Sequence, residues 1–270
     1  MSQSPNTPPE QPTYVEPRPA ATVLLVRDAE PTGIEVFVMR RTAKAVFAAD
    51  MYVYPGGRVD DVDHAAELEP YCDGLDDAAA SARLGIEKGG LAFWVAAVRE
   101  CFEEAGVLLA RRRDGAPLAL DESDRKAVHA GDLSMEELCR RDDLVLDLSA
   151  IRYIAHWVTP KNEGPRRFDT RFFLVAAPED QEGVHDDAEL VHSMWVRPHE
   201  AVAQAEAGEL LMMPPTIATL RFVSECADAD AAVAVADTVG TPPMILPKLR
   251  PTADGSRQVS LPGDPDYDDL

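Results

Sequence analysis

The sequence is poor in cationic side chains, with 26 Lys and Arg against 48 Asp and Glu in 270 residues and a net charge of −22. A chain this acidic repels nucleic acid and anionic membrane surfaces, so we expect neither as a partner. Long apolar runs are also lacking, because no segment approaches the roughly 18 apolar residues of a membrane-spanning helix. No basic start followed by an apolar run marks the N-terminus, so we expect a soluble protein.

Cysteine is scarce and widely spaced. The four cysteines show no C-x-x-C pair and nothing like the density of a disulfide-stapled domain. This usage favours a reducing compartment, and we expect a cytoplasmic protein. The four are Cys72, Cys101, Cys139 and Cys226.

The length suits one folded domain with additions at its ends. Residues 1–19 carry six prolines among polar residues, which disfavours sheet pairing and predicts a disordered arm. We place the folded domain at residues 20–226. Residues 227–270 are interpreted as an Ala- and Asp-rich connector followed by an extended tail.

Apolar patterns along the domain predict a chain of mixed strands and helices. We expect strands at 21–27, 34–40, 51–54, 151–158, 170–177 and 194–196, and helices at 76–84, 94–108, 123–129, 198–207 and 216–226. The turn at 28–33 makes the first two strands a hairpin. Ser134 and Glu137 have the spacing of a capping box, which predicts a further helix start.

The helix expected from Trp94 to Leu108 is the centre of the prediction. Its apolar residues recur at steps of three and four, so one face can be buried against a sheet. Glu100, Glu103 and Glu104 converge within one turn, where each like-charged pair costs roughly 0.2–0.5 kcal/mol on an isolated helix. A solvated acidic face is one interpretation. The other is a site for Mg²⁺, which carboxylates, waters and substrate phosphates commonly bind together.

Residues 99–107, R-E-C-F-E-E-A-G-V, resemble the second half of the Nudix box, G-x5-E-x7-R-E-U-x-E-E-x-G-U, in which U is a bulky aliphatic residue. Residues 54–57, Y-P-G-G, resemble the Pro-Gly-Gly with which the box opens after a strand. The resemblance extends to W-V-T-P at 157–160 and R-F-D-T-R-F-F at 167–173. It covers roughly residues 20–205 and identifies the chain as a member of the Nudix hydrolase superfamily.

The box is interrupted. A standard box has 13 residues between its glycine and its arginine, whereas 41 residues (58–98) separate Gly57 from Arg99, an excess of 28. Counting eight residues back from Arg99 reaches Leu91, so the first glutamate of the box is missing in that register. A long insert inside the box is a feature of a subgroup that includes peroxisomal coenzyme A diphosphatases, which this chain resembles. We place the insert at 58–90 and predict an appendage that shapes substrate access and can be removed without unfolding the protein.

The resemblance implies a Nudix-type α/β/α sandwich with a mixed sheet and a metal-dependent active site. It assigns Mg²⁺ or Mn²⁺ to the three glutamates, Glu100, Glu103 and Glu104, and to the Gly56 carbonyl. Arg99 would orient these carboxylates, and Glu103 and Glu104 would serve catalysis. In Nudix enzymes a glutamate before the tryptophan strand often supplies a further ligand or the general base. Glu189 matches this position, with His185, Asp186 and Asp187 as competing candidates.

Three arginines are candidates for binding substrate. Arg166 and Arg167 lie in a basic segment, 152–171, and arginine forks match phosphate oxygens, although surface ion pairs explain such residues equally well. Arg41 matches the arginine of the coenzyme A signature of other Nudix enzymes when the two are aligned on the proline of the box. That signature is otherwise largely absent, because Ala48 and Asp50 replace its histidine and glycine.

The implied reaction is hydrolysis of a substrate linked to a nucleoside diphosphate, with coenzyme A or an acyl derivative as the first choice. ADP-ribose and NADH are the competing substrates. A Nudix-like sensor that binds such a ligand without cleaving it is the alternative from another class, and retention of all three glutamates favours catalysis. The sequence leaves a homodimer open.

Overall fold

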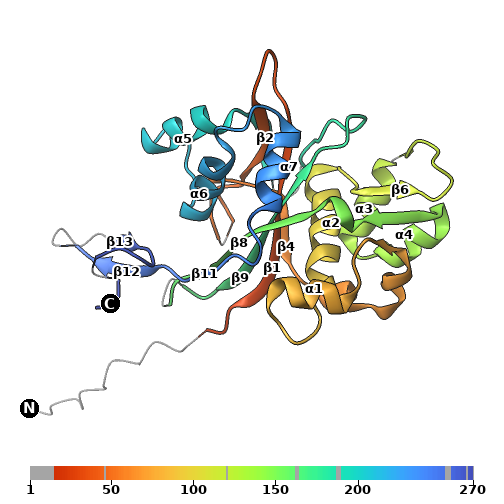
Figure 1. Ribbon diagram of the computed structural model, residues 1–270, viewed down its shortest axis with the longest axis horizontal. Helices are drawn as coiled ribbons and strands as arrows, with labels where there is room; N and C mark the ends of the chain where they lie inside the picture. The colour runs from red at the N-terminus through yellow and green to blue at the C-terminus, as the bar shows by residue number, and fades with distance from the viewer. Residues whose placement is uncertain are drawn as a thin grey trace, which may run out of the picture.

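A computed structural model describes residues 15–45, 47–119, 121–161, 164–186, 190–252, 257–265 and 267–269. Its central sheet runs in the order β10-β2-β1-β9-β8-β11, with β3 paired to β2 and β4 paired to β1 (Figure 1). The strands are β1 (Arg18–Asp28), β2 (Ile34–Arg41), β3 (Tyr52–Val53), β4 (Gly56–Arg58), β8 (Arg152–Val158), β9 (Phe168–Ala176), β10 (Leu190–Val196) and β11 (Met244–Ile245).

The sheet is mixed, as predicted. β1 and β2 form the expected hairpin, with Val26 opposite Val36, and β8 lies antiparallel to β9. β1 and β9 run parallel along their length. Side chains therefore alternate between the two faces, so that Val23 and Leu25 enter one core while Leu24 and Val26 enter the other.

Helices cover both faces of the sheet, which confirms the predicted α/β/α sandwich (Figure 1). The first face carries α1 (Asp77–Leu84) and α2 (Leu91–Ala105), and the second carries α5 (Pro198–Glu206), α6 (Pro214–Val223) and α7 (Ala229–Asp237). None of the helices in the described ranges has both the length and the apolar character needed to cross a bilayer.

A smaller sheet in the order β5-β7-β6 extends the first layer. It is built from β5 (Cys72–Asp73), β6 (Ala110–Arg112) and β7 (Leu144–Asp147). α4 (Met135–Asp142) and the 3-10 turns η2 (Ala66–Tyr71) and η3 (Leu148–Ala150) contact this sheet, whereas α3 (Glu122–Ala130) and the 3-10 turn η1 (Asp61–His64) contact α2. α4 begins with the predicted capping box, in which the Glu137 amide donates to Ser134 Oγ at 3.1 Å.

The segment between the two halves of the box belongs to the core. It contributes η1, η2, β5 and α1, and Leu68, Leu75 and Leu84 are buried in the same apolar cluster as Trp94 of α2. This burial argues against an appendage, and whether the insert can be removed without unfolding the protein stays a prediction. The physical reason for the burial is that the insert covers apolar surface of α2 and of the smaller sheet that would otherwise face water.

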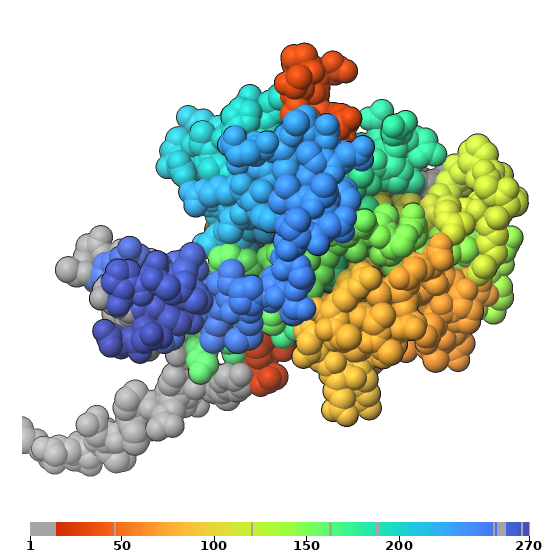
Figure 2. Space-filling model, viewed as in Figure 1, coloured from red at the N-terminus to blue at the C-terminus, as the bar shows by residue number. Residues whose placement is uncertain are grey.

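The chain ends also differ from the prediction. β1 begins at Arg18, so the last two residues of the predicted arm belong to a strand, and residues 1–14 lie outside the described residues. The predicted connector is the helix α7, which buries Ala232 and Ala236 against the second face of the sheet. Beyond it, β12 (Lys248–Pro251) and β13 (Arg257–Ser260) form a hairpin at the side of the body, in dark blue in Figure 2.

Candidate active site

Helix α2 carries the candidate site, and two local features set its limits. Its first turn is held by Asp77, which accepts from the amides of Gly89 and Leu91 at 3.0 Å each. Its end is set by Gly106, whose φ of 67° is left-handed and allows its amide to return to the Phe102 carbonyl. The helix therefore spans Leu91–Ala105, three residues earlier at both ends than predicted.

The three box glutamates are buried rather than solvated. Glu100, Glu103 and Glu104 expose only 8%, 9% and 7% of their surface. A solvated acidic helix face is therefore excluded. Buried carboxylates require partners, because burying an uncompensated charge is costly.

Strand β4 presents its two glycines to these carboxylates. The Gly56 amide donates to Glu104 Oε2 at 2.8 Å. A Cβ added to Gly57 would lie 2.5 Å from Glu100 Oε1, so any side chain at this position would displace the Glu100 carboxylate. In the Pro-Gly-Gly segment, Gly56 therefore binds one glutamate through its amide, and Gly57 leaves room for another because it has no side chain.

Arg99 lies at the centre of the carboxylates. Its Nη1 donates to Glu100 Oε1 at 2.8 Å and to Glu103 Oε1 at 3.1 Å. Its other two nitrogens reach Asp63, with Nε to Oδ1 and Nη2 to Oδ2 both at 2.8 Å. One buried guanidinium therefore serves three carboxylates, two on its own helix and one on η1.

Asp63 is the site residue that the sequence analysis missed. The signal was present, because five residues (58–62) follow Gly57 and Asp63 then occupies the position of the first box glutamate. The interruption therefore lies between Asp63 and Arg99, where 35 residues (64–98) replace the standard seven. Leu91, the position eight residues before Arg99, is a buried residue in the first turn of α2. The box is split, but its first acid is retained as aspartate.

The pKa values of the three buried glutamates are raised. Burial, reinforced by the charge of Glu103, raises the pKa of Glu100 to about 7, although Arg99 opposes the shift. Burial and then the charge of Glu100 raise the pKa of Glu104 well above its usual range, against the Gly56 amide and the charge of Arg41. The pKa of Glu103 is also raised by burial. Arg99, together with the charge of Arg41 on Glu104 and His129 Nδ1 at 3.7 Å from Glu103 Oε2, does not compensate this much buried negative charge.

Comparison with known proteins decides the family. The sequence profile described as the NUDT19 Nudix domain matches residues 77–223, which is more than half of the chain. The chain belongs to the NUDT19 Nudix family. The match begins after Asp63, so the first half of the split box lies outside the matched interval.

Two curated relatives and one solved structure illustrate the similarity. Acyl-coenzyme A diphosphatase NUDT19 of Gallus gallus is 28% identical over 73% of this chain and 65% of its own length. Putative nudix hydrolase 7 of Caenorhabditis elegans is 30% identical over 79% of this chain and 62% of its own length. The chain thus spans less than two thirds of these relatives. A NUDIX hydrolase structure from Alicyclobacillus acidocaldarius has a TM-score of 0.70 at 30% identity and covers 84% of this chain and 99% of its own.

The donor set of this Nudix site fits a hard divalent cation. The groups are buried carboxylate oxygens, the ligand type that Mg²⁺ and Mn²⁺ prefer, and their excess charge is what a bound cation would offset. Within the described ranges no three acidic, imidazole or thiol side chains are gathered closely enough to form a ready-made metal cluster. Two of the glutamates are instead turned toward Arg99.

The end of α2 also meets the loop before β10. The Asp186 amide donates to the Glu104 carbonyl at 3.1 Å, and the charge of Asp186 contributes to the raised pKa of Glu104. Asp186 was one of the competing candidates for the additional acid. Glu189 and Asp187 lie outside the described residues, so their assignment stays a prediction. Arg41 at the end of β2 is close enough for its charge to lower the pKa of Glu104.

The basic segment does not form one cluster. Arg167 is buried and donates to the carbonyls of Val15, Thr159 and Pro160, which ties the start of β1 to the loop before β9. This geometry favours a structural role, and we leave Arg167 out of the proposed substrate site. Arg166 is exposed. The remaining arginines of the segment pair with acids: Arg152 with Asp237 and Arg171 with Asp169.

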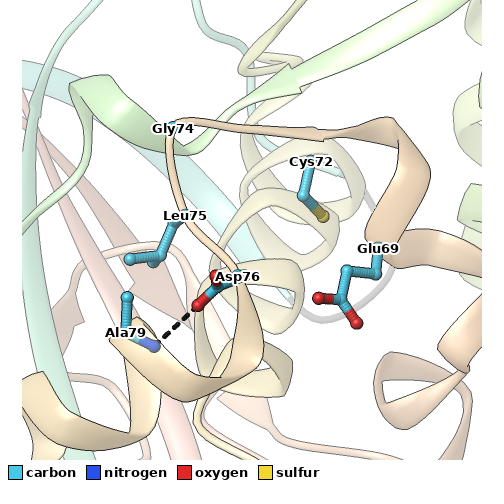
Figure 3. A pocket seen from close by; sticks show the side chains of 6 residues that line it. All are labelled: Glu69, Cys72, Gly74, Leu75, Asp76 and Ala79. Atoms are coloured by element: carbon cyan, nitrogen blue, oxygen red, sulfur yellow. Dashed lines mark hydrogen bonds between the residues drawn. The ribbon is translucent and has the colours of Figure 1, made fainter.

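A pocket of about 410 Å³ lies in the insert, where Cys72, Glu69 and Asp76 border one hollow (Figure 3). Its lining is completed by Gly74, Leu75 and Ala79 and includes no residue of the box. Burial raises the pKa of the Cys72 thiol to about 12, so the sulfur stays protonated and is a poor nucleophile. This pocket is not the candidate active site.

Proposed function

We propose that this Nudix chain hydrolyses a diphosphate bond in a substrate linked to a nucleoside diphosphate. The observation that carries the proposal is the burial of Glu100, Glu103 and Glu104 in one turn of α2, two of them bonded to Arg99, with pKa values raised by burial. Such an arrangement is costly for stability alone, since the repulsion remains when no cation is bound. Costly buried charge of this kind is a feature of functional sites.

Mg²⁺ or Mn²⁺ would be held by the three glutamates and by the Gly56 carbonyl. When bound, such an ion polarises a phosphoryl oxygen and lowers the pKa of a coordinated water. Arg99 fixes two of the carboxylates through hydrogen bonds, and the Gly56 amide fixes the third. Glu189, or Asp186 beside Glu104, accepts the proton of the attacking water.

The reaction consumes one water and needs no other co-reactant. The water oxygen bonds to one phosphorus, the bridging P–O bond of the diphosphate breaks, and the bridging oxygen leaves on the second phosphate. With coenzyme A the products are 3′,5′-ADP and phosphopantetheine. The proton accepted by the carboxylate is then released to solvent.

Coenzyme A or an acyl derivative is the substrate that the comparisons support, because the Gallus gallus relative is named an acyl-coenzyme A diphosphatase. One departure from the coenzyme A signature lies in the loop before β3. Asp50, which replaces the glycine of the coenzyme A signature, has a φ of 63°, a left-handed conformation that glycine adopts freely and aspartate tolerates. Its carboxylate is held by Arg40 at 2.6 Å. Asp50 therefore has a backbone conformation that glycine adopts more easily, although the glycine itself is absent.

Arg166 is our candidate for the 3′-phosphate of coenzyme A, since it is exposed and forms no ion pair with any residue in the described ranges. Arg41 is the candidate for the diphosphate, because its charge acts on Glu104. A guanidinium matches phosphate oxygens in both roles.

The test is turnover on coenzyme A, its 3′-dephospho form, ADP-ribose and NADH, with Mg²⁺ or Mn²⁺, for the wild type and Arg166→Ala. Arg140→Ala is the matched control, because Arg140 is also an exposed arginine and pairs with Glu136 of its own helix, α4. We expect coenzyme A to have the highest kcat/KM, and Arg166→Ala to remove its advantage over the dephospho form.

Other outcomes separate the alternatives. A higher kcat/KM on ADP-ribose or NADH than on either coenzyme form assigns the chain to the competing substrates. Binding of these ligands without turnover under any metal condition supports the sensor. If the wild type has the same kcat/KM on coenzyme A and on its 3′-dephospho form, Arg166 does not bind the 3′-phosphate. The cytoplasmic location and the homodimer stay predictions.

A further inference from the structure

The end of α2 leaves backbone carbonyls that the helix itself cannot satisfy. Because the Gly106 amide returns to Phe102 and the Val107 amide to Cys101, no helical amide is left for the carbonyls of Glu103 and Glu104. These two carbonyls belong to the residues whose side chains form the candidate site. Whatever satisfies the carbonyls therefore also sets the orientation of this last turn.

Arg125 of α3 satisfies both. Its Nε donates to the Glu103 carbonyl and its Nη2 to the Glu104 carbonyl, each at 2.9 Å. The Arg125 side chain is 7% exposed, and its Nη1 lies 3.6 Å from Glu122 one turn earlier in α3. A planar fork can bond two successive carbonyls at once, whereas an ammonium is a single point charge. A cation at this end also complements the helix dipole.

The opposite side of the same turn is held by backbone. The Val184 amide donates to the Ala105 carbonyl at 2.7 Å, and the Asp186 amide shares the Glu104 carbonyl at 3.1 Å. The turn is thus fixed between α3 and the loop that leads to β10. Gly106 is part of this fit, because a Cβ there would lie 3.1 Å from Arg125 Nη1.

We propose that Arg125 is a positioning residue for Glu103 and Glu104. It acts through the backbone of the glutamates and does not touch substrate, and it lies outside the split box, in the segment between α2 and β7. The inference rests on the proposed function, since positioning matters for turnover only if these glutamates serve catalysis. Its structural part, the anchoring of the last turn of α2, can be measured without activity.

The test compares Arg125→Lys and Arg125→Gln with the wild type and with Arg141→Gln. Arg141 is the matched control, because it pairs with Asp124 of α3 at 2.8 and 2.6 Å, so its loss loosens α3 without touching α2. The measurements are kcat and KM per folded molecule, Mn²⁺ binding by electron paramagnetic resonance, and amide hydrogen exchange of the peptide covering residues 101–109.

We expect Arg125→Lys to stay folded, with kcat lowered roughly 10- to 100-fold, KM little changed, Mn²⁺ binding weakened and exchange accelerated in 101–109 alone. Arg141→Gln should leave all four quantities near their wild-type values. Wild-type exchange in 101–109 of Arg125→Lys overturns the proposal. Thermal melts give the unfolded fraction of each variant. If the activity falls only in proportion to that fraction, the proposal is also overturned, and Arg125 has a structural role alone.

Failure of the proposed function is distinguishable from failure of this inference. If the wild type cleaves no diphosphate substrate with either metal, the proposed function fails. Hydrogen exchange then decides whether Arg125 anchors the end of α2. If Arg125→Gln does not fold, the decision rests on Arg125→Lys, which keeps the charge and most of the stem.

Discussion

Asp63 and Arg99 are 36 residues apart in the chain, and their side chains form a two-point ion pair with both N···O distances at 2.8 Å. The pair joins the two halves of the split box across the insert. Both partners are buried, so neither charge can be satisfied by water if the other is removed. The pair therefore links the folding of the insert to the geometry of the site.

Asp63→Asn should be strongly destabilising, because it removes one partner of a buried pair. We expect a loss of roughly 3 kcal/mol in the free energy of unfolding, at the low end for such changes since Arg99 keeps Glu100 and Glu103. Urea unfolding monitored by tryptophan fluorescence measures it. Asp61→Asn, an exposed acid in the same 3-10 turn, is the control and should change stability little.

Glu104→Gln should separate activity from stability. The substitution removes a buried charge whose pKa is raised by burial, and an amide oxygen can still accept from the Gly56 amide. We expect the melting temperature of the metal-free protein to hold or rise, while kcat falls by at least about 100-fold because an amide is a poorer metal ligand. Retained turnover in this variant and in Glu103→Gln, with EDTA present, would contradict the metal-hydrolase proposal.

The stability of the metal-free protein should fall as pH rises from about 5 to 8. The Glu100 carboxyl has a folded-state pKa of about 7 against an ordinary value of 4.5, so the folded state binds this proton more tightly than the unfolded state. Its contribution is fully present below pH 4.5 and is lost as pH passes 7, which amounts to roughly 3 kcal/mol for this group alone.

Thermal melts in EDTA across this pH range measure the effect. Glu100→Gln should flatten the curve, and saturating Mg²⁺ should reverse the trend, since a bound cation favours the ionised carboxylates. A metal-free protein whose stability rises steadily from pH 5 to 8 contradicts the raised pKa values.

Gly57→Ala should reduce turnover more than stability. The added methyl would lie 2.5 Å from Glu100 Oε1, and the flexible end of that side chain can move away without disturbing the backbone. We expect kcat to fall roughly 10- to 100-fold through the displaced carboxylate. Gly131→Ala is the comparison, because its φ of 76° and open surroundings predict backbone strain of about 1 kcal/mol and normal turnover.

Leu68→Ala tests whether the insert belongs to the core. Leu68 is 2% exposed and lies in the cluster with α2, so we expect a loss of about 2–5 kcal/mol in the free energy of unfolding. Val62→Ala, at a residue that is 58% exposed, should be nearly neutral. Equal, small effects at both positions would restore the interpretation of the insert as an appendage.

Structural features that depend on residues close together in the sequence could be predicted from it. The β1–β2 hairpin, the capping box at Ser134 and the helix bearing the three glutamates each rest on local spacing, which the chain carries wherever it folds. The limits of α2 were displaced by three residues because Asp77 and Gly106 fix its two ends, and the first of these contacts spans 14 residues.

The partners of buried groups were decided by the tertiary structure. Arg167 and Arg166 are adjacent and chemically identical, yet one is buried among backbone carbonyls while the other faces solvent. Sequence spacing cannot separate them, because the difference arises from which carbonyls the fold brings near. The burial of the insert and of α7 was missed for the same reason, since weakly patterned segments become core when a larger apolar surface needs cover.

The sequence by itself therefore determined the chemistry of the candidate site: three glutamates on one helix face, an arginine beside them and glycines ahead of them. The tertiary structure decided that Asp63 pairs with Arg99 across the insert and that Arg125 bonds the end of α2. Local residue types fix what a side chain can do, because that is covalent chemistry. Only the fold fixes what each side chain meets, because contacts between distant residues depend on the packing of the whole chain.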